Sequence, residues 1–245
     1  MTRCPTELPV AVITGANRGI GLATAKRLGR NGLHVVLACR DTAKGEEAAA
    51  GLRQEGLSAS SVWFDHATDG NPAQAAAHVA GVHGRCDVLV ANAGIWNDWG
   101  IAPSALPIAA LRETLEANLI SAVAAANAFL PLLRAATQPR LVMVSSGLGS
   151  LARAAAHDSF ACLAYQCSKA ALNMAMLCYA HELRGTAAKV NACCPGWCRT
   201  ALGGGQDAAQ RSADDGADII ARLAMLAADG PTGGYVDDQG QTIPF

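Results

Sequence analysis

Short runs of apolar, largely β-branched residues alternate along the chain with longer stretches of helical length. Several of the runs are apolar without alternation, which is typical of parallel strands covered on both faces. The stretches between them are rich in Ala, Leu, Arg and Glu, as at 20–30, 44–54 and 112–134, and Asn31-Gly32 is expected to end the first of these helices. The expected strands lie at 10–13, 34–38, 61–64, 87–91, 141–144 and 189–192.

This alternation favours an α/β fold with a doubly wound parallel sheet. A length of 245 residues suits one domain, and no repeat or linker divides it. We therefore expect a single Rossmann-type NAD(P)-binding domain over 1–245, with about seven strands and helices on both faces. Two segments are expected to be irregular: 147–163 and a substrate loop at about 201–215. His157 in the first is expected to be an exposed loop residue, with a substrate contact as the alternative.

The composition of the chain limits the classes of partner that the protein is expected to bind. The 19 basic and 20 acidic residues give a net charge of −1, so no strong field favours nucleic acid or an anionic membrane. Charged residues recur too often for an apolar run of about 18 residues, and the first apolar run is too short for a secretory signal. We expect a cytoplasmic protein. Its nine cysteines are expected to be buried free thiols, and its six scattered histidines make a metal site improbable.

A glycine-rich turn follows the first expected strand directly and leads into the first helix. Such a turn lets the backbone approach a pyrophosphate held at the helix N-terminus, so its position favours dinucleotide binding. Glycines also close ordinary strand-to-helix loops, which is the alternative. The spacing is G-x-x-x-G-x-G, and the candidate cofactor residues are Gly15, Asn17, Arg18, Gly19, Ile20 and Gly21.

The end of the second strand indicates which dinucleotide binds. Proteins that prefer NAD place a carboxylate there for the ribose 2′-hydroxyl, whereas this chain has Cys39 followed by Arg40. Arg40 and Arg18 would together favour the 2′-phosphate of NADPH. Asp41 is the competing ribose ligand, but it also suits the N-cap of the next helix. The alternative is that both arginines are solvated surface charges.

A candidate catalytic group lies in the second half of the chain. Tyr165 and Lys169 are spaced i and i+4, which places both on one face of a helix. Upstream, Ser145 and Ser146 end the fifth expected strand. A lysine ammonium about 4 Å from a tyrosinate stabilises it by about 4 kcal/mol at an effective dielectric constant of about 20, which would bring the pKa of Tyr165 toward neutrality. A serine hydroxyl can donate to a carbonyl oxygen as negative charge develops there.

With these residues assembled, the chain resembles the short-chain dehydrogenase/reductase family over essentially its whole length, and within it the carbonyl reductases. The glycine spacing is this family's own, and 37–41, 191–200 and the C-terminal segment resemble the carbonyl reductases in particular. The motifs occur in the family's order: Thr14-Gly-x-x-x-Gly-x-Gly21, Ala91-Asn-Ala-Gly94, Asn118, Ser146, Tyr165-x-x-x-Lys169 and Pro195-Gly196.

The resemblance implies a role for each matching residue. Tyr165 would be the acid, Ser146 would hold the carbonyl, Lys169 would also bind the nicotinamide ribose, and Asn118 would hold a water in a proton relay. Trp197 would line the substrate pocket. Apart from the resemblance, Trp96 and Trp99 follow Ala93-Gly94 and are candidates for the pocket wall, with two core residues as the equal alternative. The remaining cofactor contacts would be Asp65, Asn92 and Gly94 on the adenine side and Pro195, Gly196 and Thr200 at the carboxamide.

The chain departs from the family pattern in two places. His66 follows Asp65 where an aliphatic residue is usual. The gap from Ser146 to Tyr165 exceeds the family minimum but lacks the long insertion of monomeric animal carbonyl reductases, so both a monomer and a homodimer stay open. Ser145 would replace Ser146 if the strand register were shifted by one residue.

These features predict reduction of an apolar or aromatic ketone, aldehyde or quinone by NADPH. One alternative is an NAD(P)-dependent alcohol dehydrogenase that runs toward oxidation in a biosynthetic pathway. Another is a non-catalytic dinucleotide sensor on the same fold, although such a protein would be expected to have lost Tyr165 or Lys169.

Overall fold

In the computed structural model, which describes residues 8–156, 162–202 and 209–245, seven parallel strands form one sheet in the order β3-β2-β1-β4-β5-β6-β7. The order reverses between β1 and β4, and open α/β sheets bind their ligands at the carboxyl ends of strands beside such a reversal. The strands are β1 Val10–Thr14, β2 His34–Cys39, β3 Ala59–Trp63, β4 Val88–Ala91, β5 Arg140–Val144, β6 Lys189–Cys193 and β7 Tyr235–Val236.

The predicted doubly wound fold is confirmed, and the six expected strands lie within two residues of their predicted bounds. β7 was not predicted as a separate run, because two residues are too short to show a periodicity. Its place is set by long-range bonds to β6: the Ala192 amide donates to the Gly234 carbonyl at 2.9 Å, and the Cys194 amide to the Val236 carbonyl at 2.8 Å.

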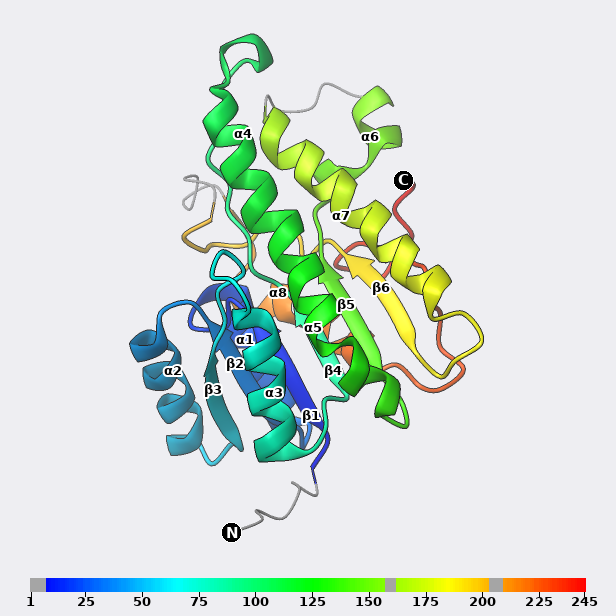
Figure 1. The fold of residues 1–245 in the computed structure, drawn as a ribbon. Helices are drawn as coiled ribbons and strands as arrows, with labels where there is room; N and C mark the ends of the chain where they lie inside the picture. Colours follow the sequence, from blue (N-terminus) through cyan, green and yellow to red (C-terminus); the bar gives the residue numbers. More distant parts are fainter. Residues whose placement is uncertain (1–7, 157–161, 203–208) are drawn as a thin grey trace.

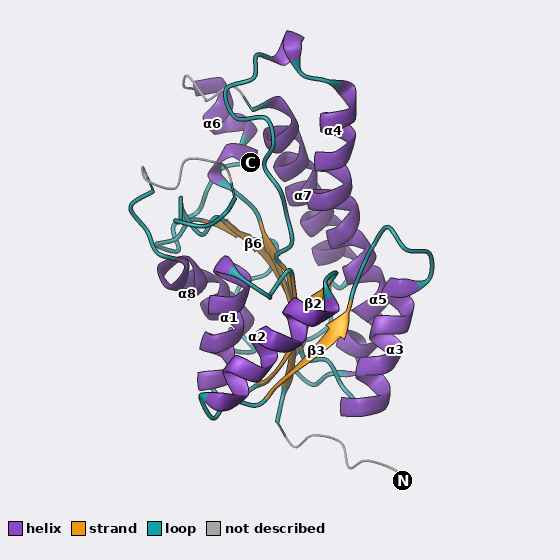
Figure 2. Ribbon diagram, turned by 90° about the vertical axis from the view of Figure 1, so that its left-hand side faces the viewer, coloured by secondary structure: helices purple, strands orange, loops and turns teal. Residues whose placement is uncertain are grey.

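Helices cover both faces of the sheet, and Figure 2 shows the two layers from the side. On one face, Val79 of α3, Phe129 of α5 and Met176 of α7 pack in a buried cluster with β-strand residues, and on the other face α1, α2 and α8 pack in a second cluster. The helices are α1 Gly19–Arg30, α2 Thr42–Gln54, α3 Asn71–His83, α4 Ile108–Leu115, α5 Ser121–Ala135, α6 Leu151–Ala156, α7 Leu163–Glu182 and α8 Ala213–Ala224.

One long helix crosses most of the molecule, because a π-helical turn, Glu116–Ile120, joins α4 to α5 without a break (Figure 1). By length and composition alone, Ile108–Ala135 could cross a membrane, a test that core helices of soluble proteins also pass. Its Ala125, Phe129 and Leu133 are buried in the core cluster. That packing accounts for the apolar face of the helix.

Two expectations were wrong in part. The segment 147–163 is not irregular throughout, since it contains a 3₁₀ turn at Gly147–Gly149 and α6. The hydroxyl of Ser150 accepts the Arg153 amide at 3.1 Å and caps α6. Gly147 and Gly149, just before Ser150, made this segment look irregular in the sequence. Residues 157–161, with His157, and 203–208 of the predicted substrate loop lie outside the described residues.

The second expectation concerned the cysteines. The described cysteines are free thiols, but Cys167 and Cys178 on α7 are exposed rather than buried.

Candidate active site

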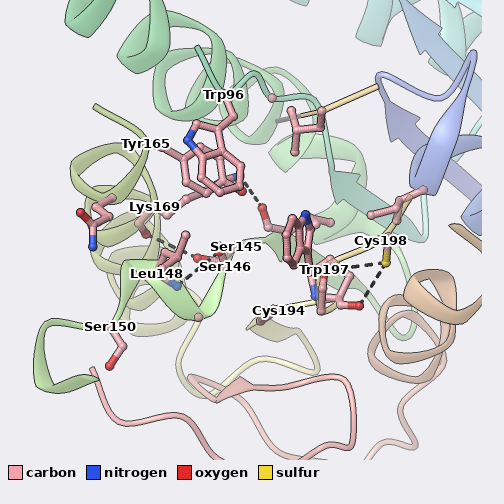
Figure 3. Close-up of a pocket in the computed structure, with 18 of the residues that line it drawn as sticks. Trp96, Ser145, Ser146, Leu148, Ser150, Tyr165, Lys169, Cys194, Trp197 and Cys198 are labelled. Carbon is pink, nitrogen blue, oxygen red and sulfur yellow. Dashed lines mark hydrogen bonds between the residues drawn. The ribbon is translucent and has the colours of Figure 1, made fainter. Parts of the chain in front are cut away.

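A pocket of about 440 Å³ lies where the loops after β4, β5 and β6 meet the first turns of α7 (Figure 3). It brings together residues that are far apart in the sequence. The predicted residues that line it are Ile20, Asn92, Gly94, Trp96, Ser146, Tyr165, Lys169, Pro195, Gly196, Trp197 and Thr200. The other predicted residues do not line it: Gly15, Asn17, Arg18, Gly19 and Gly21 lie in the turn between β1 and α1 and its first helical residues, Arg40 follows β2, Asp65 follows β3, and Asn118 lies in the π-helical turn.

The glycine-rich turn is tight enough to require its glycines. Gly15 has a φ of +64°, and a Cβ there would lie 3.0 Å from the Ala93 Cα. A Cβ on Gly21 would lie 2.6 Å from the carbonyl oxygen of Gly15. Arg18, which precedes α1, gives it no side-chain cap, and no acidic residue lies in the first turn of the helix. The first amides of α1 therefore have neither a carboxylate nor a capping side chain in front of them, which suits a phosphate.

The two predicted 2′-phosphate ligands are both exposed, and neither forms an ion pair with a carboxylate of the described residues. Asp41 has a different role, because its carboxylate accepts the Lys44 amide at 3.1 Å and caps α2. That bond holds the pKa of Asp41 below its usual value. At the predicted 2′-phosphate site, the side chains of Arg18 and Arg40 are therefore available to a ligand, whereas the carboxylate of Asp41 is engaged as a helix cap.

Two of the other predicted cofactor residues support the backbone around the site. Asn92 bonds β1 to β4, since its side-chain amide donates to the Thr14 carbonyl at 3.0 Å. Asp65 closes the turn after β3 by accepting the Ala67 amide at 3.1 Å. Gly94 lies against the amide of Asn118, because a Cβ there would be 3.0 Å from Asn118 Oδ1.

Tyr165 and Lys169 are both buried and lie on the pocket side of α7. The Lys169 Nζ lies 5.6 Å from the centre of the Tyr165 ring and donates to the Val144 carbonyl at 2.8 Å. Burial lowers the pKa of Lys169 to about 8. Burial also raises the pKa of Tyr165, and a hydrogen bond with Ser146 opposes that rise. The predicted shift of this phenol toward neutrality is therefore absent from the structure.

The two serines after β5 have different surroundings. The Ser145 hydroxyl is buried and donates to the Lys169 carbonyl at 3.5 Å, toward the backbone of α7. The Ser146 hydroxyl accepts the Leu148 amide at 3.3 Å, and its remaining hydrogen-bond partner is the hydroxyl of Tyr165 in the pocket. Of the two, Ser146 is the better placed to donate to a ligand. Its carbonyl accepts the Tyr235 hydroxyl, which anchors this turn to β7.

The side chain of Asn118 is fully buried in the π-helical turn, and protein atoms engage it on both sides. Its Oδ1 accepts the Ile95 amide at 2.7 Å, and its Nδ2 donates to the Ile95 carbonyl at 3.0 Å and to the Ser168 hydroxyl at 2.9 Å. These bonds hold the loop after β4 against α7. The role of Asn118 in holding a water stays a prediction.

Aromatic rings form one wall of the pocket. Trp96 stacks on Tyr165 with ring centroids 4.5 Å apart, and Trp99 contacts Trp96 at 4.7 Å. Trp99 also stacks on Trp197 with ring centroids 5.8 Å apart, so the three indoles form a continuous row along the pocket. The resemblance predicted Trp197 in the wall, and the sequence left Trp96 and Trp99 undecided between pocket and core; all three line the pocket.

One contact that shapes the site is invisible in the sequence. The buried carboxylate of Asp98 accepts the Ala164 amide at 2.6 Å, in the first turn of α7 and directly before Tyr165. A carboxylate in that place accepts a hydrogen bond from an amide that has no partner within the helix, and its negative charge interacts favourably with the helix dipole. No local motif marks Asp98, because the helix that it caps begins far along the chain.

The fold and the pocket define a Rossmann-type oxidoreductase that uses a nicotinamide dinucleotide. The family model described as short chain dehydrogenase matches residues 9–221. The chain therefore belongs to the short-chain dehydrogenase/reductase family, as its motifs predict.

Similar proteins include several reductases. The chain is 33% identical to the short-chain dehydrogenase/reductase ATR10 of Stachybotrys chlorohalonatus, over 94% of this chain and 88% of the relative. It is 30% identical to carbonyl reductase [NADPH] 1 of Rattus norvegicus, over 96% and 98% of the two chains. Among solved structures, the NADPH-bound carbonyl reductase from chicken fatty liver superposes with a TM-score of 0.85 at 25% identity, over 98% of this chain and all of that one (100%).

Proposed function

We propose that this protein reduces the carbonyl group of a ketone, aldehyde or quinone with NADPH, and that Tyr165 supplies the proton. The observation that carries the proposal is the convergence of Tyr165, Ser146 and Lys169 in one pocket at the carboxyl ends of the strands. A relative named as an NADPH carbonyl reductase, similar over nearly its whole length, supports the same reaction.

The cofactor residues fit a dinucleotide with a 2′-phosphate. The first amides of α1 have no capping side chain, which suits a pyrophosphate, and a Cβ on Gly21 would collide with Gly15 and Asn92 and disturb the turn. Arg18 and Arg40 are the cations for the 2′-phosphate, while Asp41 is occupied as a helix cap. Pro195, Gly196 and Thr200 line the pocket on the side expected for the carboxamide. When bound, the reduced nicotinamide supplies the hydride.

The residues of the chain would then handle the charge that develops on the carbonyl oxygen. The Ser146 hydroxyl donates to this oxygen, and Tyr165 gives it a proton as the alkoxide forms. Burial raises the pKa of Tyr165, so the phenol keeps its proton in the free protein and needs a nearby positive charge to release it. Lys169, as an ammonium, stabilises the tyrosinate that remains.

The substrate is expected to be apolar or aromatic, because indole and aliphatic groups form most of the pocket wall. Relatives named salutaridine reductase, from Papaver somniferum, and (+)-neomenthol dehydrogenase, from Capsicum annuum, are similar to this chain and support a bulky organic substrate. Because the second relative is named a dehydrogenase, oxidation of an alcohol with NADP⁺ is the alternative reaction.

The test follows oxidation of NADPH and of NADH by the purified protein with a panel of quinones, aromatic ketones and aldehydes. Tyr165→Phe should abolish turnover and leave NADPH binding intact. Tyr179→Phe is the matched control, because its hydroxyl lies on the same helix but bonds to Asn127 at 2.7 Å, away from the pocket. Alcohols with NADP⁺ test the oxidative alternative. Tight NADPH binding without turnover in either direction would overturn the proposal in favour of a dinucleotide sensor.

A further inference from the structure

Two cationic side chains line the pocket, and no aspartate or glutamate of the described residues lines it with them. Lys169 is buried and donates to the Val144 carbonyl at 2.8 Å. The second cation, Arg153 on α6, is exposed and forms no ion pair with a carboxylate in the described part of the chain. The reaction proposed above uses Lys169 and leaves Arg153 without a role.

The guanidinium of Arg153 lies close to the reacting groups. Gly147 directly follows Ser146, and a Cβ on Gly147 would lie 3.0 Å from a terminal nitrogen of Arg153 and 3.8 Å from the Cys194 sulfur. The positive charge of Arg153 opposes the rise in pKa that burial imposes on the Cys194 thiol. The guanidinium therefore lies in the pocket lining beside Gly147, the residue that follows Ser146.

The backbone of Arg153 is held in place, although its side chain has no ion-pair partner among the described residues. The Ser150 hydroxyl accepts the Arg153 amide at 3.1 Å and itself donates to the Pro244 carbonyl. The Ala152 amide donates to the Phe245 carbonyl at 3.1 Å. The start of α6 is thus tied to the segment after β7, so a ligand of Arg153 has to order only a side chain.

We infer that the substrate is an aromatic ketone, aldehyde or quinone that carries a carboxylate, and that Arg153 binds this carboxylate. The inference rests on the proposed function, because it assumes that the carbonyl group lies between Ser146 and Tyr165. The planar guanidinium can hold both oxygens of a carboxylate, and no acidic side chain among the described lining residues would repel it. The indoles of Trp96, Trp99 and Trp197 cover the rings of such a substrate.

The experiment compares acids with their neutral esters. The probes are 3- and 4-carboxybenzaldehyde and the methyl esters of both, reduced with NADPH by the wild type, Arg153→Gln and Arg153→Lys. Arg184→Gln is the matched control, since Arg184 is exposed near the far end of α7 and the substitution changes the net charge by the same amount. Binding of 4-(hydroxymethyl)benzoate with NADP⁺ present, followed by tryptophan fluorescence, provides a readout that needs no turnover.

Arg153→Gln should raise the KM of the better acid about ten-fold and leave the kinetics of its ester unchanged. Arg153→Lys should have an intermediate effect, and Arg184→Gln none. Equal effects on acid and ester, or no effect on the acid, would overturn the inference while ester reduction upholds the proposed function. If no aldehyde is reduced but binding of the carboxylate still depends on Arg153, the proposed function fails and the carboxylate site stands. Carboxylate binding that is the same in wild type and Arg153→Gln overturns the site in that case too.

Discussion

The indole of Trp96 lies nearly parallel to the phenol ring of Tyr165, with centroids 4.5 Å apart and an angle of 14° between the planes (Figure 3). One face of the proposed acid is therefore covered by an aromatic ring, and a substrate has to approach Tyr165 from the side of Ser146. The buried Nε1 of Trp96 has no hydrogen-bond partner among the described residues. Trp96 thus restricts the approach to Tyr165.

Replacing Trp96 should weaken the binding of aromatic substrates. A stacked aromatic pair contributes about 0.5–1.5 kcal/mol, so Trp96→Ala should raise the KM of an aromatic ketone by roughly 3- to 10-fold, and Trp96→Phe by less. The KM of NADPH should stay the same. Trp63→Phe serves as the control, because Trp63 lies on β3 and is 42% exposed. A larger effect on NADPH than on the ketone would contradict this role.

Removing either cofactor arginine should change the choice between the two dinucleotides. A charge-assisted hydrogen bond contributes about 1.5–3 kcal/mol, so Arg40→Ala should raise the KM of NADPH by about ten-fold or more and leave that of NADH nearly unchanged. Arg18→Ala should act in the same direction. Steady-state kinetics with both cofactors checks this, with Arg184→Ala as a remote control. Equal losses for NADPH and NADH would mean that the arginines contact something other than the 2′-phosphate.

Two glycine-to-alanine substitutions should have opposite effects on stability. A Cβ on Gly149 would lie 2.8 Å from the backbone carbon of Lys169, so Gly149→Ala should displace this residue, lower the free energy of unfolding by about 1–3 kcal/mol and reduce turnover. Gly51 in α2 has nothing within 4 Å of its would-be Cβ. Gly51→Ala should therefore stabilise the protein by about 0.4–1 kcal/mol and keep its activity. Urea unfolding and kcat measure both; a neutral Gly149→Ala would show that the turn can shift.

The buried His34 should make the protein less stable in mild acid. Desolvation by burial, helped by the nearby His83, lowers the pKa of His34 from 6.5 to about 4. Between these values the unfolded chain binds a proton that the folded state does not, so stability is present above pH 6.5 and is lost as the pH falls toward 4. The loss is about 3 kcal/mol at most, at 1.36 kcal/mol for each unit.

Urea unfolding at a series of pH values checks the effect of His34. His34→Asn should flatten the dependence between pH 6.5 and 4, the two values of the pKa. His78→Asn should leave it unchanged, because His78 is exposed on α3. The same slope in wild type and His34→Asn would assign the acid sensitivity to other groups. His34 begins β2, at the end of the sheet opposite to the pocket, so kcat should not follow this titration.

Local patterns in the sequence were enough to predict the sheet, the glycine turn and the positions of Tyr165 and Lys169. Each depends on residues close together in the chain: apolar runs between helical stretches, glycines where a positive φ is needed, and an i, i+4 pair on one helix face. The cap of Asp41 on α2 was also available, because a cap and its helix are adjacent. Such features follow from backbone geometry, and the tertiary structure leaves them unchanged.

The tertiary structure alone decided what surrounds those residues. Trp96 reaches Tyr165, Asp98 caps α7 and Arg153 enters the pocket only because the loops after β4 and β5 fold over the same edge of the sheet. The direction in which the pKa of Tyr165 moves was also beyond the sequence, since the spacing to Lys169 predicts attraction between charges but says nothing of the burial that raises this pKa. Contacts between distant segments and the loss of water depend on how the chain packs, and no local pattern records either.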